Sequence, residues 1–233
     1  MAINFFADIF FCCETHKKKQ HSFLNQMAAQ QPKYNEEKPN DYEKGTYYPY
    51  RNDWTPEVRK IMTSFMDAVE ASDHELVERL MRMHGEKIDL EARDSTFHSL
   101  VNMAVRRHDN KMVELLLDIG ADIEWAGTKT HLRYKPLHYA IAINQLDTAQ
   151  LLIDRGANVN AFSPDGQGNP IHSAACHGNL DAIRLLLNNG AIADTRAIEI
   201  AQEAKQLKAI DYLNAWRVLN NYSSSEEDEV DDD

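Results

Sequence analysis

The chain has 233 residues, of which 43% are hydrophobic, and its 25 lysine and arginine residues against 37 aspartate and glutamate residues give a net charge of −12. This acidic balance argues against a nucleic-acid binder, which normally presents a basic face. Three cysteines, two of them adjacent, do not make an extracellular disulfide framework. No run approaches the ~20 apolar residues of a spanning helix. We therefore expect a soluble protein of the cytoplasm or nucleus, without a metal or a cofactor.

Residues 1–26 form a first segment with an apolar face, which includes Phe5 and Phe10, and a basic cluster at Lys17–Lys19. With acylation of Cys12 and Cys13, such a segment is suited to peripheral membrane contact through residues 3–19. The alternatives are a helix packed on the rest of the protein, or a segment that is absent because translation starts at Met27. Adjacent cysteines are unlike the usual spacing of zinc ligands, which disfavours a metal site.

Residues 27–54 are polar, with several prolines and tyrosines, and they predict a linker whose aromatic end is suited to lying over the folded domain. A helix is expected to begin at Thr55-Pro56-Glu57, with the threonine as N-cap and the proline in the first turn. Its apolar residues, which share one helical face, are Val58, Ile61, Met62, Phe65, Met66 and Val69.

A repeat follows this helix. The pentapeptide PLHYA at 136–140 returns as PIHSA at 170–174, and a pair of histidines in such a motif could be ligands, a catalytic pair or parts of a scaffold. Sliding the chain on itself aligns Ala68, Ala104, Ala140 and Ala174, at spacings of 36, 36 and 34, and a shortened fifth copy contributes Ala201. The sequence therefore contains about five copies of one unit.

Each copy predicts two short helices. The first is small and apolar and ends at a residue tolerant of the left-handed conformation, Asn144 or Gly178. The second carries a leucine run and ends at a glycine, which is Gly120, Gly156 or Gly190 in three of the copies. A unit of this size has too little core to fold alone and is stabilised by stacking on its neighbours.

The period, the two pentapeptides and the segments LLIDRGANVN and LLLNNGAIAD resemble the ankyrin repeat over about residues 65–219. The resemblance implies an all-α solenoid of about five helix-turn-helix repeats over 55–221, with atypical capping repeats and flexible terminal tails. It also implies that His138 and His172 are structural hydrogen-bonding residues rather than a catalytic pair. Asn102 stands where the second copy would have its histidine.

The resemblance further implies a concave binding face built from loop fingers and the exposed positions of the first helices. Mapped onto this sequence, that face comprises Met103, Arg106, Arg107, Tyr139, Ile143, Ser173 and His177, with Phe162 and Gln167 from a finger.

The finger EWAGTKTHLRYK, residues 124–135, is a positive island in an acidic chain. Its basic and aromatic residues are Trp125, Lys129, His131, Arg133, Tyr134 and Lys135. Arginine, tryptophan and tyrosine dominate binding hot spots, so this finger is a candidate for partner recognition. The alternative is a solvated loop whose tryptophan packs on the adjacent finger.

At the other end, the loop before Ala201 is shortened, as a terminal cap requires, and Trp216 and Leu219 are expected to complete the last helix on the core. Residues 222–233 form an acidic tail, disordered on composition, in which Ser223, Ser224 and Ser225 resemble acidophilic kinase sites. The tail either solubilises the protein or competes with an acidic partner for the positive island.

No nucleophile with its base and no phosphate-binding loop is evident, and Cys176 and His177, adjacent on a helix, point about 100° apart. The sequence predicts a monomeric, non-enzymatic adaptor or inhibitor that binds a protein partner, such as an acidic and apolar peptide segment. The alternative is a membrane-tethered or translocated regulator that is targeted by its N-terminal segment or its tail.

Overall fold

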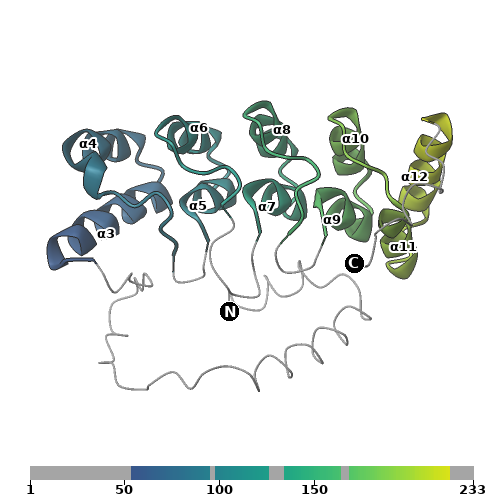
Figure 1. The fold of residues 1–233 in the computed structure, drawn as a ribbon, viewed down its shortest axis with the longest axis horizontal. Coiled ribbons are helices and arrows are strands. Elements are labelled where there is room, and N and C mark those ends of the chain that lie inside the picture. Colours follow the sequence, from purple (N-terminus) through teal and green to yellow (C-terminus); the bar gives the residue numbers. More distant parts are fainter. Residues whose placement is uncertain (1–53, 95–97, 126–133, 164–167, 221–233) are drawn as a thin grey trace, which may run out of the picture.

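The computed structural model describes residues 54–94, 98–125, 134–163 and 168–220. Within these residues ten α-helices form two layers (Figure 1). The inner layer consists of α3 (Pro56–Glu70), α5 (Leu100–Arg106), α7 (Pro136–Ala142), α9 (Pro170–His177) and α11 (Thr195–Glu203). The outer layer consists of α4 (His74–His84), α6 (Asn110–Asp118), α8 (Leu146–Asp154), α10 (Leu180–Asn188) and α12 (Leu207–Leu219).

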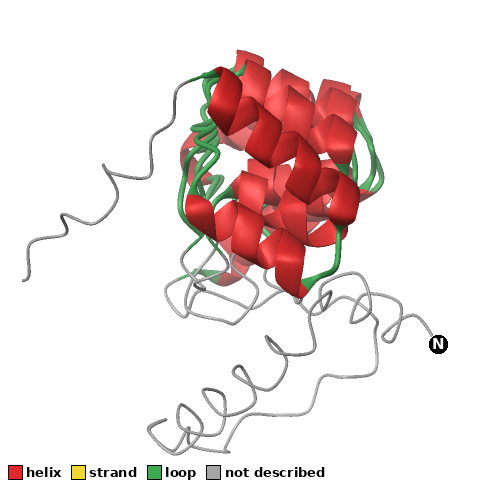
Figure 2. Ribbon diagram, turned by 90° about the vertical axis from the view of Figure 1, so that its right-hand side faces the viewer, coloured by secondary structure: helices red, strands yellow, loops and turns green. Residues whose placement is uncertain are grey.

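One inner and one outer helix make each of five repeats, which stack side by side (Figures 1 and 2). Seen along the stack in Figure 2, the two helical layers are joined by loops and turns at both edges. In the described part of the chain there is no β-strand; two isolated bridges, Arg93 to Ser99 and Ser163 to Gly168, close the roots of loops. The protein is an all-α solenoid, as the sequence predicts.

The first helix begins where the sequence predicts. Thr55 is the N-cap of α3, its side chain accepts a hydrogen bond from the Val58 N–H, and Pro56 opens the helix. The apolar face of α3 is buried, with Phe65 and Met66 fully inaccessible. Within the described residues α3 is the first helix of the stack, and its buried face packs on this end of the core.

The turn from inner to outer helix has the same geometry in all five repeats. Its left-handed residues, with φ between 56° and 65°, are Ser72, His108, Asn144, Gly178 and Lys205. After each of them, a backbone N–H bonds to the carbonyl of the repeat alanine, as from Gln145 to Ala140 at 2.8 Å. The prediction that Asn144 and Gly178 are left-handed turn residues is confirmed. The turn recurs once in every repeat, at the same interval as the repeat alanines.

The repeat alanines sit where neighbouring repeats approach most closely. Ala68, Ala104, Ala140, Ala174 and Ala201 are each at most 2% exposed. A side chain longer than a methyl group at these positions would push neighbouring helices apart, because interiors are packed without spare volume. This explains why all five repeats carry alanine there.

Glycines end three of the outer helices. Gly120, Gly156 and Gly190 have φ of 99°, 92° and 88°, and the following alanine N–H bonds back into the helix. The first repeat differs, because Gly85 has φ of −49° and continues into a 3₁₀ turn, η1 (Gly85–Lys87). The looser match of the first copy therefore corresponds to a different loop geometry.

The C-terminal end shows one error in the sequence prediction. Trp216 packs against the core, but Leu219 is 80% exposed and does not complete it. The reason is rotation along α12: Ala209 and Leu213 occupy its buried side, and Leu219 falls outside it. In the part of the chain the structure describes, no helix combines the length and apolarity needed to cross a membrane.

Candidate protein-binding face

Side chains from the inner helices reach forward to the loop of the next repeat. The Nε2 atom of buried His138 lies 3.1 Å from the carbonyl oxygen of Gly168. One repeat earlier, Asn102 Nδ2 donates to the carbonyl oxygen of Tyr134 at 2.7 Å. Gly168 and Tyr134 both lie two residues before the next inner helix, so asparagine and histidine make the same connection.

His172 makes a different connection, because the loop that follows it is shortened. Its Nδ1 accepts from the Asn169 N–H, so its Nε2 carries the proton and donates to both carboxylate oxygens of Asp194, at 2.8 and 2.9 Å. Asp194 is also the N-cap of α11 and accepts from the Ala197 N–H. Burial raises the pKa of Asp194, but the hydrogen bonds from His172 and from the Ala197 N–H, with the nearby charge of Arg217, together hold that pKa below its ordinary value.

The electrostatics of His138 suit a structural role. Burial removes the imidazole from water and lowers the pKa of His138 from 6.5 to about 4, so the ring is neutral at pH 7. His138 uses its Nε2, and His172 uses both ring nitrogens, for hydrogen bonds between or within repeats.

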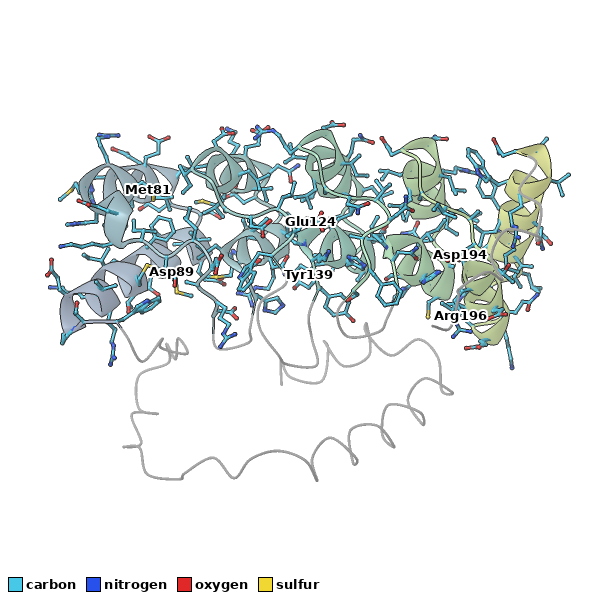
Figure 3. The ribbon with its side chains drawn as sticks, viewed as in Figure 1. Met81, Asp89, Glu124, Tyr139, Asp194 and Arg196 are labelled. Atoms are coloured by element: carbon cyan, nitrogen blue, oxygen red, sulfur yellow. The ribbon has the colours of Figure 1, made fainter. Side chains whose placement is uncertain are left out.

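The middle of the inner-helix face, meaning the surface of α3, α5, α7, α9 and α11, is filled rather than open. Tyr139, labelled in Figure 3, is 0% exposed, and Met103 and Tyr134 are also buried. The expectation that these side chains face a partner was therefore wrong. The ring centroid of His98 lies 5.1 Å from that of Tyr139, and the ring centroid of Tyr134 lies 6.4 Å from that of Tyr139, with both rings tilted. Residues at the roots of two loops thus cover the α7 tyrosine, and burial raises the pKa of Tyr139 to about 12.

Arg106 belongs to an ionic cluster that spans three elements. Its guanidinium lies 2.7 Å from Glu70 on α3 and 3.5 Å from Asp94 in the following loop. Asp94 is 6% exposed, and its carboxylate also lies 3.6 Å from His98 Nδ1. Arg106 is therefore flanked by two carboxylates. Sequence reasoning missed Glu70, Asp94 and His98, since no local spacing connects residues that only the stack brings together.

The positive finger is described only at its two ends, and Lys129, His131 and Arg133 lie outside the described residues. Lys135 is paired with Glu124 at 2.9 Å, which neutralises one of the four predicted basic groups. The indole N–H of Trp125 donates to the Glu91 carbonyl oxygen at 3.1 Å. This contact with the preceding loop is the one expected if the tryptophan packs on the adjacent finger.

Other predicted side chains are accessible. Arg107 and His177 are exposed, Ile143 and Ser173 are half-buried, and Phe162 is 62% exposed. His177 Nδ1 lies 2.8 Å from the Ser173 carbonyl oxygen and donates to it, which orients the ring. Arg107, Ile143 and His177 occupy one position of three successive repeats, immediately before the left-handed turn residue. We call these three residues, together with Phe162 in the loop that precedes α9, the recognition row.

Other predicted sites are not placed. Gln167, Cys12, Cys13 and the serines 223–225 lie outside the described residues. Among the described residues, no group of three or more histidine, cysteine, aspartate and glutamate side chains is arranged to hold a metal ion.

Five stacked helix pairs with side-chain bonds between successive loops define a helical repeat scaffold of the kind that binds other proteins. Family models of ankyrin repeats match residues 65–163 (Ankyrin repeats, 3 copies) and residues 137–192 (Ankyrin repeats, many copies). Together they span residues 65–192, more than half of the chain. The chain belongs to the ankyrin-repeat family, and it is a protein-interaction module.

Two relatives share part of this region. Over 88 residues the chain is 38% identical to the B-cell lymphoma 3 protein homolog of Mus musculus, a match covering 38% of this chain and 19% of that protein. Over 109 residues it is 29% identical to the E3 ubiquitin-protein ligase hecd-1 of Caenorhabditis elegans, covering 47% of this chain and 3% of that protein. The chain thus matches a fifth or less of the length of either relative.

Proposed function

We propose that this protein is a non-enzymatic adaptor or inhibitor that binds a segment of a protein partner along the recognition row. The observation that carries the proposal is the contrast between two positions of the repeat. The buried position is alanine in all five copies, whereas the position three residues later is Ala71, Arg107, Ile143, His177 and Ala204 in turn. The residue type is therefore the same in every repeat at the buried position, where neighbouring repeats pack, and differs between repeats at the later position.

The row defines the chemistry of its partner. Arg107 is exposed and makes no ion pair among the described residues, whereas the charge of Arg106 is balanced by Glu70 and Asp94. The row therefore offers a cation at α5 and apolar groups at Ile143 and Phe162. A segment with an acidic residue followed by apolar residues is complementary to this order.

The repeat spacing suggests the length of that segment. Packed helices lie about 10 Å apart, so Arg107 to His177 spans about 20 Å across two repeat steps. An extended strand rises about 3.3 Å per residue, and six or seven residues cover this span. Successive contacts would then come from every third residue of an extended segment.

The test replaces three accessible members of the row together: Arg107→Glu, Phe162→Ala and His177→Ala. Proteins captured by the full chain and by this variant are compared by quantitative mass spectrometry, and the most depleted protein is then purified and titrated by calorimetry. We expect affinity to fall by about a hundredfold or more, because two or three hot-spot contacts of 1–2 kcal/mol each are removed.

A matched variant on the outer helices keeps the comparison specific. Met83→Ala, Lys111→Glu and Asn188→Ala remove an apolar, a basic and a polar side chain from exposed positions of α4, α6 and α10. It should retain the partners of the wild-type protein, with both variants showing wild-type helix content by circular dichroism. Loss of the same partners from both variants, or from neither, contradicts the proposal.

A further inference from the structure

The end of the stack that is formed by α3 and α4 carries an apolar stripe on α4 (Figure 1). The stripe consists of Leu76, Leu80 and Met83, which are four and three residues apart and therefore share one side of the helix. Met83 is 65% exposed, and Leu76 and Leu80 are partly exposed. A contiguous, accessible stripe of large apolar side chains is a candidate contact surface.

The positions of Leu76 and Leu80 are buried in every later repeat. Their equivalents, each at most 3% exposed, are Met112 and Leu116, Thr148 and Leu152, Ala182 and Leu186, and Ala209 and Leu213. Each of those outer helices has a preceding repeat beside it, whereas α3 and α4 form the first repeat of the described stack. The stripe therefore faces outward, on the side that a preceding repeat covers elsewhere.

Other outward-facing positions at the two ends of the described stack are polar. On α3, Ser64 and Asp67 are exposed, whereas Met103, the equivalent of Asp67 in the second repeat, is 1% exposed. On α12, Asn214 is exposed where α10 has Leu187, which is 4% exposed. Polar side chains are stable in water, but apolar ones gain from being covered, so the α4 stripe is the surface that calls for an occupant.

The chain enters the stack beside this stripe. Lys87, in the turn that follows α4, pairs with Glu57 in the first turn of α3 at 2.7 Å, so the C-terminal end of α4 lies next to the start of α3. Trp54, which precedes α3, is partly buried and packs against the core. The sequence immediately before it, TYYPYRND at residues 46–53, lies outside the described residues. Its point of attachment places it within reach of the stripe.

We propose that residues 46–53 of the same chain run along α4 and cover the stripe with their tyrosine side chains. The lengths agree. Leu76 and Met83 are separated by about 10 Å along the helix axis, at 1.5 Å per residue. Tyr47 and Tyr50 are separated by about 10 Å in an extended segment, at 3.3 Å per residue. A segment that runs back from the start of α3 therefore brings Tyr50 to the Met83 end of the stripe and Tyr47 to the Leu76 end.

The chemistry of the segment also suits this surface. Pro49 favours extended backbone at the residue before it, which keeps the segment from coiling away from the helix. A tyrosine ring covers apolar side chains while its hydroxyl stays in water. Exposed Arg79 lies beside the stripe on α4, where its guanidinium can stack on a tyrosine ring.

The test places a photoreactive group in the segment of the full-length protein. Tyr50→p-benzoylphenylalanine keeps an aromatic ring and, on irradiation, bonds to C–H groups that it touches. We expect cross-links to Leu80 or Met83, located by peptide mass spectrometry, in a product with the mass of one chain. Tyr34→p-benzoylphenylalanine, in the same linker but further from Trp54, is the control and should not label α4.

Two variants of the Tyr50→p-benzoylphenylalanine protein test the contact itself. Leu80→Asp should lower the yield of the cross-link about tenfold, because the tyrosines would have to bury an unpaired carboxylate. Arg82→Asp changes an exposed residue that points about 160° away from Leu80, and it should leave the yield unchanged. Circular dichroism checks the helix content of both variants, and Met83→Asp, at a more exposed position, replaces Leu80→Asp if that variant loses helix.

Three results would overturn the proposal. A product with the mass of two chains would mean that a second copy covers the stripe. The others are the absence of any cross-link to α4 and equal yields from the Leu80→Asp and Arg82→Asp variants. None of these measurements involves the recognition row, so failure here leaves the proposed function intact.

Discussion

We expect His138 to contribute to the acid sensitivity of the protein, and His138→Asn to remove that contribution while keeping the connection between repeats. The pKa of His138 is about 4 in the folded protein, because burial disfavours the charged ring, against 6.5 for an ordinary histidine. Between these two values the unfolded chain binds a proton that the folded protein excludes. The free energy of unfolding therefore falls as the pH is lowered from about 6.5 toward 4.

The size of the effect follows from the two pKa values. Linkage gives a loss of about 2 kcal/mol at pH 5 relative to pH 7.5, from His138 alone. Asparagine cannot titrate, and Asn102 shows that it bonds to the equivalent carbonyl oxygen one repeat earlier. We expect the variant to cost about 1 kcal/mol or less at pH 7.5 and to be the more stable protein at pH 5.

The assay is urea denaturation followed by circular dichroism at both pH values. His177→Asn, which changes an exposed histidine, is the control and should reproduce the wild-type dependence on pH. The reasoning is refuted if His138→Asn loses as much stability between pH 7.5 and 5 as the wild-type protein does. That result would mean that folding does not keep His138 neutral.

Three pairs of substitutions test the scaffold by thermal or urea denaturation. At Gly168, φ is 86° and an added Cβ would clash with the buried imidazole of His172, so Gly168→Ala should cost more than about 2 kcal/mol. Gly156→Ala, where φ is 92° but the space is open, should cost about 1 kcal/mol. Asn102→Ala leaves the Tyr134 carbonyl without its donor and should cost about 1–3 kcal/mol, which Asn102→His should partly restore. Asp194→Ala removes a helix cap and a histidine partner and should cost about 2 kcal/mol or more, whereas Asp194→Asn should retain the cap and cost less. Equal costs within any of these pairs would contradict the contact assigned to it.

The repeat was predictable because its signals are local. A left-handed turn, a terminal glycine and a threonine cap each act through bonds to residues within one or two helical turns, so Thr55, Asn144 and Gly178 could be assigned from the sequence. The small alanine recurs with the period of the stack, because every repeat meets its neighbours in the same way. Length, period and residue type were enough to predict the number of repeats and the start of the first helix.

What the sequence by itself determined was therefore the scaffold: an ankyrin-repeat solenoid with its turns and its repeat period. Only the tertiary structure decided which of the mapped surface residues are accessible. Tyr139 was predicted to face a partner and is covered by His98 and Tyr134, and Arg106 is balanced by Glu70 and Asp94. Those contacting residues come from adjacent repeats and from loop roots, where side-chain size and direction do not follow the repeat. Accessibility and charge balance depend on such non-local neighbours, so the spacing of residues along the chain does not predict accessibility or charge balance.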